Sequence, residues 1–128
     1  MSVDKLSLVV FSGEFERVHY ALSMAAAAVA TNRPATLFFT MGAARALVDW
    51  RTLPGAAADD GLRAKGLAGF DELLDACVAL GATIMVCEMG LKALGIDPAS
   101  LRADLPITPG GIVTFLADAS KDGAMLFL

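Results

Sequence analysis

Cys87 stands at the junction of a strand-like segment and a helix-like segment, where a thiol is well placed for chemistry. The stretch "ATIMVCEMGLKALGI", residues 82–96, passes from an apolar β-branched run through Cys87 into helical spacing. Backbone N–H groups at the start of a helix carry partial positive charge, which favours a thiolate nearby. Glu88 opposes this effect because it is an acid beside the thiol. The alternative interpretation is a buried strand-end cysteine that serves only as packing.

The second cysteine and the single histidine have weaker claims to a chemical role. Cys77 lies on the apolar face of a helix expected over residues 70–80, and the separation we infer from Cys87 exceeds the ~7 Å Cα limit for a disulfide. We therefore expect Cys77 in the core. His19 borders the apolar stripe of the first expected helix, where it is either a proton donor to a sulfur intermediate or a structural residue.

Metal and nucleotide sites lack their usual residues in this sequence. One histidine and two cysteines leave too few ligands of the usual kind for a structural zinc site. The chain has no glycine-rich dinucleotide or phosphate motif and no C-x-x-C redox pair. We therefore expect no metal and no cofactor.

Five β-rich runs alternate with segments of helical periodicity. Strands are expected at residues 5–11, 35–40, 82–87, 105–107 and 124–128. Helices are expected between them, the first capped by Ser12 and the last running from Pro109 to Ser120. Residues 51–69 lose the periodicity and are expected to form an exposed loop or a lid.

This alternation predicts an α/β fold. We expect residues 1–128 to form one three-layer α/β/α domain with a mainly parallel five-stranded sheet. Binding sites in such sheets lie outside the carboxyl ends of the strands, and Cys87 falls at one of those ends.

Composition narrows the classes of partner. Hydrophobic residues make up 56% of the chain, which predicts a homo-oligomer, with contacts through the Ala-rich first helix or the segment around Trp50. The net charge of −4 and the scattered Lys and Arg residues argue against nucleic acid and anionic membranes as partners. The longest nearly apolar run, residues 21–30, is too short to span a membrane, and the N-terminus lacks a secretory signal. We therefore expect a cytoplasmic protein.

Four segments together resemble the DsrE/DsrF-like proteins of sulfur relay. They are "SGEFERVHYALSMAAAA", "ATLFFTMGA", "ATIMVCEMGLKALGI" and "GGIVTFLADA". The resemblance implies a three-layer fold, an oligomer and a carrier cysteine, Cys87, that receives sulfane sulfur as a persulfide and passes it on. It also singles out possible supporting residues around Cys87, namely Glu88, Met89 and Gly90 of the following helix and Ser12 and Gly13 of the first turn.

Two functions from different classes are therefore carried forward. The first is a sulfur-relay protein of the sulfurtransferase or persulfide-carrier class, whose partners are donor and acceptor proteins or small persulfides. The second is a non-catalytic oligomeric binding or regulatory domain in which Cys87 is packing. A thiol peroxidase ranks below both, because Thr83 lies four residues before Cys87 within the strand and its side chain need not meet the sulfur.

Overall fold

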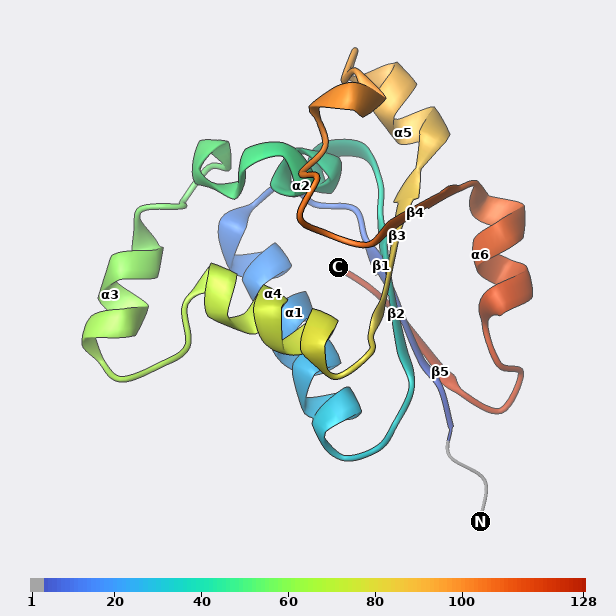
Figure 1. The fold of residues 1–128 in the computed structure, drawn as a ribbon, viewed down its shortest axis with the longest axis horizontal. Helices are drawn as coiled ribbons and strands as arrows, with labels where there is room; N and C mark the ends of the chain where they lie inside the picture. Colours follow the sequence, from blue (N-terminus) through green and yellow to red (C-terminus); the bar gives the residue numbers. More distant parts are fainter. Residues whose placement is uncertain (1–3) are drawn as a thin grey trace.

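One five-stranded sheet organises the protein (Figure 1). The computed structural model describes residues 4–128. All neighbouring strands pair in parallel, in the order β4-β3-β2-β1-β5. The strands are β1 (Leu6–Val10), β2 (Ala35–Phe39), β3 (Thr83–Cys87), β4 (Ile107–Gly110) and β5 (Ala124–Phe127).

Helices lie on both faces of this sheet, which confirms the predicted three-layer α/β/α class (Figure 1). Figure 1 shows α1 and α4 on one side of the strands and α6 on the other. The α-helices are α1 (Phe15–Ala30), α2 (Ala46–Asp49), α3 (Ala58–Ala64), α4 (Phe70–Ala79), α5 (Glu88–Ala93) and α6 (Ile112–Asp118). Short 3₁₀ turns are η1 (Met41–Arg45), η2 (Trp50–Thr52) and η3 (Pro98–Ser100).

The larger core lies between the sheet and the layer of α1 and α4. Alternate residues of the three central strands point into it, among them Leu8, Leu37 and Ile84, and all three are buried. The alanines of α1 repeat along its buried side, where small side chains let the helix approach the sheet closely. This layer contains most of the buried apolar side chains.

On the opposite face, α6 packs against the sheet. The remaining alternate residues of the strands meet Phe115 of α6 in a smaller apolar cluster of Phe38, Met85 and Cys87, with Val9 packed against it. The rings of Phe38 and Phe115 stack with their centroids 4.7 Å apart and their planes 17° from parallel. One aromatic pair therefore anchors the first half of α6.

A polar contact anchors the other end of α6. Asp118 accepts a hydrogen bond from the Thr36 hydroxyl at 2.7 Å and pairs with the Lys5 ammonium at 2.6 Å. Burial disfavours the charged carboxylate, but the hydrogen bonds and charge supplied by Lys5 and Thr36 hold the pKa of Asp118 below its ordinary value. The helix is thus attached to the sheet at two separate points.

Three local predictions need correction. Residues 51–69 contain helix α3 rather than only a loop, because the buried Asp59 carboxylate accepts a hydrogen bond from the Phe70 N–H and pairs with Arg63. Pro109 lies in β4 instead of starting a helix, since an edge strand tolerates a residue without an N–H. Ser12 lies before the start of α1, where its hydroxyl accepts from the Glu14 N–H, and Glu14 takes the cap position.

Candidate functional site

Cys87 is the last residue of β3 and directly precedes α5, as the sequence predicts. Because the strands are parallel, the turns that follow β1, β2 and β3 meet at the same edge of the sheet. The Ser12-Gly13 turn and the segment around Thr40 therefore lie at the same edge as Cys87. This edge is the candidate functional site.

The thiol of Cys87 is closed off from solvent. Its residue is 1% exposed, and its side chain lies under α6 in the cluster with Phe38, Met85 and Phe115. In this structure the sulfur accepts no hydrogen bond from the first turn of α5. Reaction at Cys87 thus requires movement of its aromatic cover.

Gly90 fits α5 tightly against the end of β2. A Cβ atom at Gly90 would lie 2.7 Å from the Met41 backbone nitrogen and 2.9 Å from the Thr40 hydroxyl oxygen. Met41 itself adopts a φ of 49°, an uncommon conformation for a residue with a side chain. Because Gly90 has no side chain, α5 can pack this closely against the residues that follow β2.

Thr40 is a site residue that the sequence analysis missed. The β2–β3 register ends with Phe39 opposite Val86, and one further step places Thr40 opposite Cys87 on the same face. Thr40 is 7% exposed. The strand register, which the sequence does not state, is what brings these two residues together.

An uncharged cavity of about 340 Å³ lies beside the cluster that contains Cys87. Phe38 and Phe115 form part of its wall and also pack in that cluster, so they separate the cavity from the thiol. Thr40 supplies a hydroxyl, and none of the lining side chains is charged. The lining residues are Val9, Phe11, Phe38, Thr40, Met41, Met89, Ile112, Phe115, Leu116, Met125 and Phe127.

The predicted supporting residues divide into two groups. Glu88, Met89 and Gly90 follow Cys87 directly; Met89 lines the uncharged cavity, and Glu88 is exposed. Ser12 and Gly13 lie at the same edge of the sheet, where a Cβ on Gly13 would come 3.0 Å from the Gly42 carbonyl oxygen. These five residues are therefore near the strand ends.

His19 lies away from this edge on the other side of the sheet. Its Nε2 atom is 3.0 Å from the Ala68 carbonyl oxygen, and its ring centroid is 5.4 Å from that of Phe15, a core residue of the α1 layer. The cluster of Cys87 belongs to the α6 layer. His19 therefore connects α1 to the end of the 51–69 segment and does not contact the thiol.

Cys77 lies in the core, as predicted. It is fully buried, and its thiol donates to the Leu22 carbonyl oxygen at 3.5 Å. Burial raises the pKa of Cys77 to about 11. This thiol is therefore both inaccessible and protonated near neutral pH.

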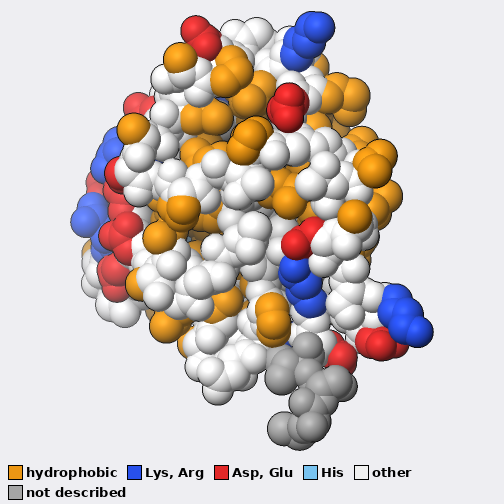
Figure 2. Space-filling view, turned by 45° about the vertical axis from the view of Figure 1, so that its right-hand side comes forward, with side chains coloured by type: hydrophobic (Ala, Val, Ile, Leu, Met, Phe, Trp, Pro, Cys, Tyr) orange, Lys and Arg blue, Asp and Glu red, His pale blue; other side chains and the backbone are white. Residues whose placement is uncertain are grey.

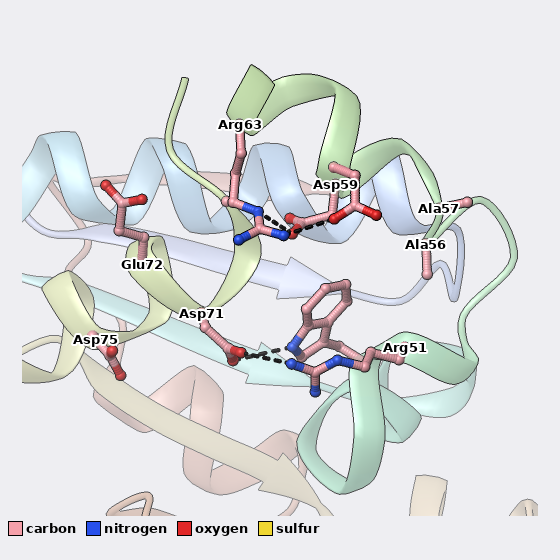
Figure 3. A pocket seen from close by; sticks show the side chains of 11 residues that line it. Arg51, Ala56, Ala57, Asp59, Arg63, Asp71, Glu72 and Asp75 are labelled. Carbon is pink, nitrogen blue, oxygen red and sulfur yellow. Dashed lines mark hydrogen bonds and ion pairs between the residues drawn. The ribbon is translucent and has the colours of Figure 1, made fainter. Parts of the chain in front are cut away.

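A second cavity, of about 540 Å³, lies between η2, α3 and α4 (Figure 3). Figure 3 shows the Asp71 carboxylate turned towards Arg51. The Nε1–H of Trp50 donates to the same carboxylate at 3.0 Å. Arg63 pairs in turn with Asp59 and Asp60. Arg51 and Arg63 are thus paired, whereas Glu72 and Asp75, which also line this cavity, form no ion pair among the described residues.

Trp50 and helix α3 of the 51–69 segment both line this second cavity. Trp50 is 6% exposed and stacks on Phe70 with ring centroids 4.9 Å apart, so it is a core residue of this chain. Helix α3 walls this cavity on the α1 side of the sheet, away from α6 (Figure 1). The 51–69 segment therefore does not cover Cys87, and α6 does.

Metal ligands do not gather anywhere in residues 4–128: no three His, Cys, Asp or Glu side chains are grouped closely enough to hold an ion. Over the same residues, each helix is too short or too polar to cross a bilayer.

Gly90→Ala should destabilise the protein, because the new methyl group would meet backbone and hydroxyl atoms of residues 40 and 41. We expect the free energy of unfolding in urea to fall by about 1–3 kcal/mol. Gly61→Ala is the matched control, since Gly61 lies in α3 with open space around it. That change should be neutral or stabilise by up to about 1 kcal/mol. Equal effects at both positions would contradict the tight contact at Gly90.

Phe115→Leu should speed alkylation of Cys87 in the native protein, because a smaller side chain covers the thiol less completely. We expect a rise of about fivefold to tenfold with a loss of about 1–2 kcal/mol in the free energy of unfolding. Iodoacetamide labelling followed by peptide mapping measures the rate at each cysteine. Phe70→Leu, a buried ring in the other layer, is the control. If Phe70→Leu speeds labelling of Cys87 as much as Phe115→Leu does, the reagent reaches the thiol through global unfolding rather than through opening of α6.

We compared the sequence with family models and curated proteins, and the structure with solved structures. The model of the DsrE/DsrF-like family matches residues 5–127. The structure is similar to that of BT1422 from Bacteroides thetaiotaomicron, a conserved protein of unknown function, with a TM-score of 0.64 and 15% identity over 98% of this chain and 95% of that one. It is also similar to the YchN protein from E. coli, with a TM-score of 0.58 and 17% identity over 98% of both chains. No curated protein matches the chain. The chain belongs to the DsrE/DsrF-like family.

Proposed function

We propose that this protein is a sulfur-relay protein that accepts sulfane sulfur on Cys87 as a persulfide and passes it to a partner thiol. The observation that carries the proposal is the place of Cys87, at the carboxyl end of β3 and directly before α5 in a DsrE/DsrF-like fold. Strand ends of this kind are where parallel α/β sheets hold their sites.

The proposed chemistry needs only thiols. The Cys87 thiolate attacks the outer sulfur of a donor persulfide, a new S–S bond forms on Cys87, and the donor leaves as a thiolate. A partner thiolate then attacks the outer sulfur on Cys87, and Cys87 leaves as the thiolate it was before. The sulfur atom moves without net oxidation, so no cofactor takes part.

The closed conformation supports a two-state account of this reaction. Cys87 is 1% exposed, so α6 or the rings of Phe38 and Phe115 must move before a donor reaches the sulfur. Once the persulfide has formed, the same cover would shield it from small reductants. This assigns to α6 the shielding role that the sequence suggested for residues 51–69.

The burial of Cys87 also favours a second candidate function. A thiol packed among Phe38, Met85 and Phe115 is what a purely structural cysteine would look like. In that case the protein would be a non-catalytic binding or regulatory domain that keeps the fold. Sulfur uptake distinguishes the two candidates directly.

The proposed partners are sulfur donors and acceptors, either proteins or small persulfides, in the cytoplasm. Net charge of −4 and the absence of basic clusters in the sequence argue against nucleic acid as a partner. Reduced thiols persist in that compartment, as a carrier cysteine requires.

Cys87→Ser should abolish sulfur uptake, because a hydroxyl is a poor nucleophile near neutral pH and cannot form a persulfide. Mass spectrometry after incubation with polysulfide should show one added sulfur atom on the Cys87 peptide of the native protein and none on the variant. Cys77→Ser is the control: it should keep uptake while losing about 1 kcal/mol of stability, since its hydroxyl can still donate to the Leu22 carbonyl. Uptake that survives in Cys87→Ser would refute the carrier function.

The protein should also associate with itself, because large apolar side chains of the described residues remain exposed. Light scattering at micromolar concentration should give a mass above the 13.2 kDa of one chain. A mass equal to one chain would overturn this expectation.

A further inference from the structure

The two edges of the sheet differ in how they resist pairing with another strand. Edge strand β4 contains Pro109, which has no N–H to offer. Edge strand β5 has the sequence AMLF, with no proline and no charge, and all four residues are exposed. Of the two described edge strands, β5 thus lacks the prolines and charges that commonly hinder pairing with a further strand.

The backbone of β5 presents hydrogen-bonding groups at that edge. The N–H group of Ala124 donates at 3.0 Å to the carbonyl oxygen of Lys5, which directly precedes β1, and that of Leu128 donates at 2.8 Å to the carbonyl oxygen of Val9 in β1. Successive peptide groups of a strand alternate in direction, so those of Met125 and Phe127 point away from β1. These groups lie at the open end of the sheet order.

Apolar side chains surround this edge on the α6 side. Among the described residues, six exposed large apolar side chains line the uncharged cavity beside α6. Figure 2 turns this side of the molecule forward and shows hydrophobic side chains gathered over it, with few charges between them. The six are Phe11, Met89, Ile112, Leu116, Met125 and Phe127, called here the apolar face.

We propose that a second copy of this chain covers the β5 edge, with the two β5 strands antiparallel about a two-fold axis. The two five-stranded sheets then become one continuous sheet, and the apolar faces of both copies flank the junction. Met125 and Phe127 belong to both features, since their backbone lies at the edge and their side chains line the cavity. One contact thus satisfies free peptide groups and covers apolar surface.

Two observations select a second copy as the occupant. A strand edge is self-complementary when two copies pair antiparallel, so a two-fold contact needs no second binding surface. Charge points the same way: each chain carries a net charge of −4, and two copies repel least where they meet through side chains without charge. An acidic or basic partner would find no complementary group among the residues that line this cavity.

This contact would also bear on the candidate site. The cavity that the second copy borders is the one separated from Cys87 by Phe38 and Phe115. The inference rests on the self-association part of the proposed function and not on its sulfur chemistry.

A pair of substitutions at one residue tests the strand pairing. Met125→Ala removes the side chain and keeps the outward N–H, whereas Met125→Pro removes the N–H as well without breaking a bond to β1. Native protein should have a mass of twice 13.2 kDa, or an even multiple of it, in light scattering. Met125→Pro should weaken association about tenfold more than Met125→Ala. Equal effects of the two variants, or an odd number of chains, would overturn strand pairing.

A second pair tests the apolar face. Leu116→Asp places a charge on it, and Leu67→Asp places a charge on a side chain of similar exposure outside it, 54% against 55%. Only Leu116→Asp should lower the mass towards one chain, while circular dichroism shows both variants folded. A Leu116→Asp protein that keeps its full mass would contradict the contact.

Sulfur loading of Cys87 in the native protein is measured alongside. If Cys87 takes up sulfur while light scattering gives the 13.2 kDa of a single chain, the strand-pairing inference is refuted and the proposed sulfur chemistry is supported. If the native protein is an oligomer that the variants disrupt but takes up no sulfur, the strand pairing is supported and the sulfur chemistry is refuted.

Discussion

Parallel pairing of β1, β2 and β3 is the constraint on which the candidate site depends. It brings the three turns that follow these strands to one edge, although they are far apart in the sequence. It also sets Thr40 opposite Cys87 and requires Gly90 to pass close to Met41. A shift of one residue between β2 and β3 would turn Cys87 or its neighbours to the opposite face, because side chains alternate along a strand. The site is therefore a product of register as much as of residue type.

The fold was largely predictable because its signals are local. Alternating strand and helix periodicities predict a parallel α/β sheet, and the place of Cys87 follows from the end of one such strand. The burial of Cys77 followed from helical spacing in the same way. Predictions were wrong where a distant contact decides the structure: α3 forms where Asp59 reaches the Phe70 N–H, and Pro109 joins a strand at the sheet edge.

The cover over Cys87 was not predictable, because it combines residues from separate elements. Phe38 lies in β2 and Phe115 in α6, and nothing in either segment indicates that their rings stack above the end of β3. Strand alternation separates Phe38 from Phe39, so the sequence could have assigned the two rings to opposite faces. Only the register and the path of α6 show which of them covers the thiol. Exposure of a site is thus harder to predict from sequence than its position.

The pairing of β1 with β5 has a consequence for folding. Leu6 lies beside Ala124, so this pair of strands joins residues from opposite ends of the described chain. Such contacts close the longest loops and form slowly, because the entropy of the intervening chain must be lost first. During synthesis, β1, β2 and β3 can assemble with α1 and α4 before β5 has left the ribosome. The outer edge of β1 then stays unpaired until synthesis reaches β5, a period in which the nascent chain is open to wrong strand pairing.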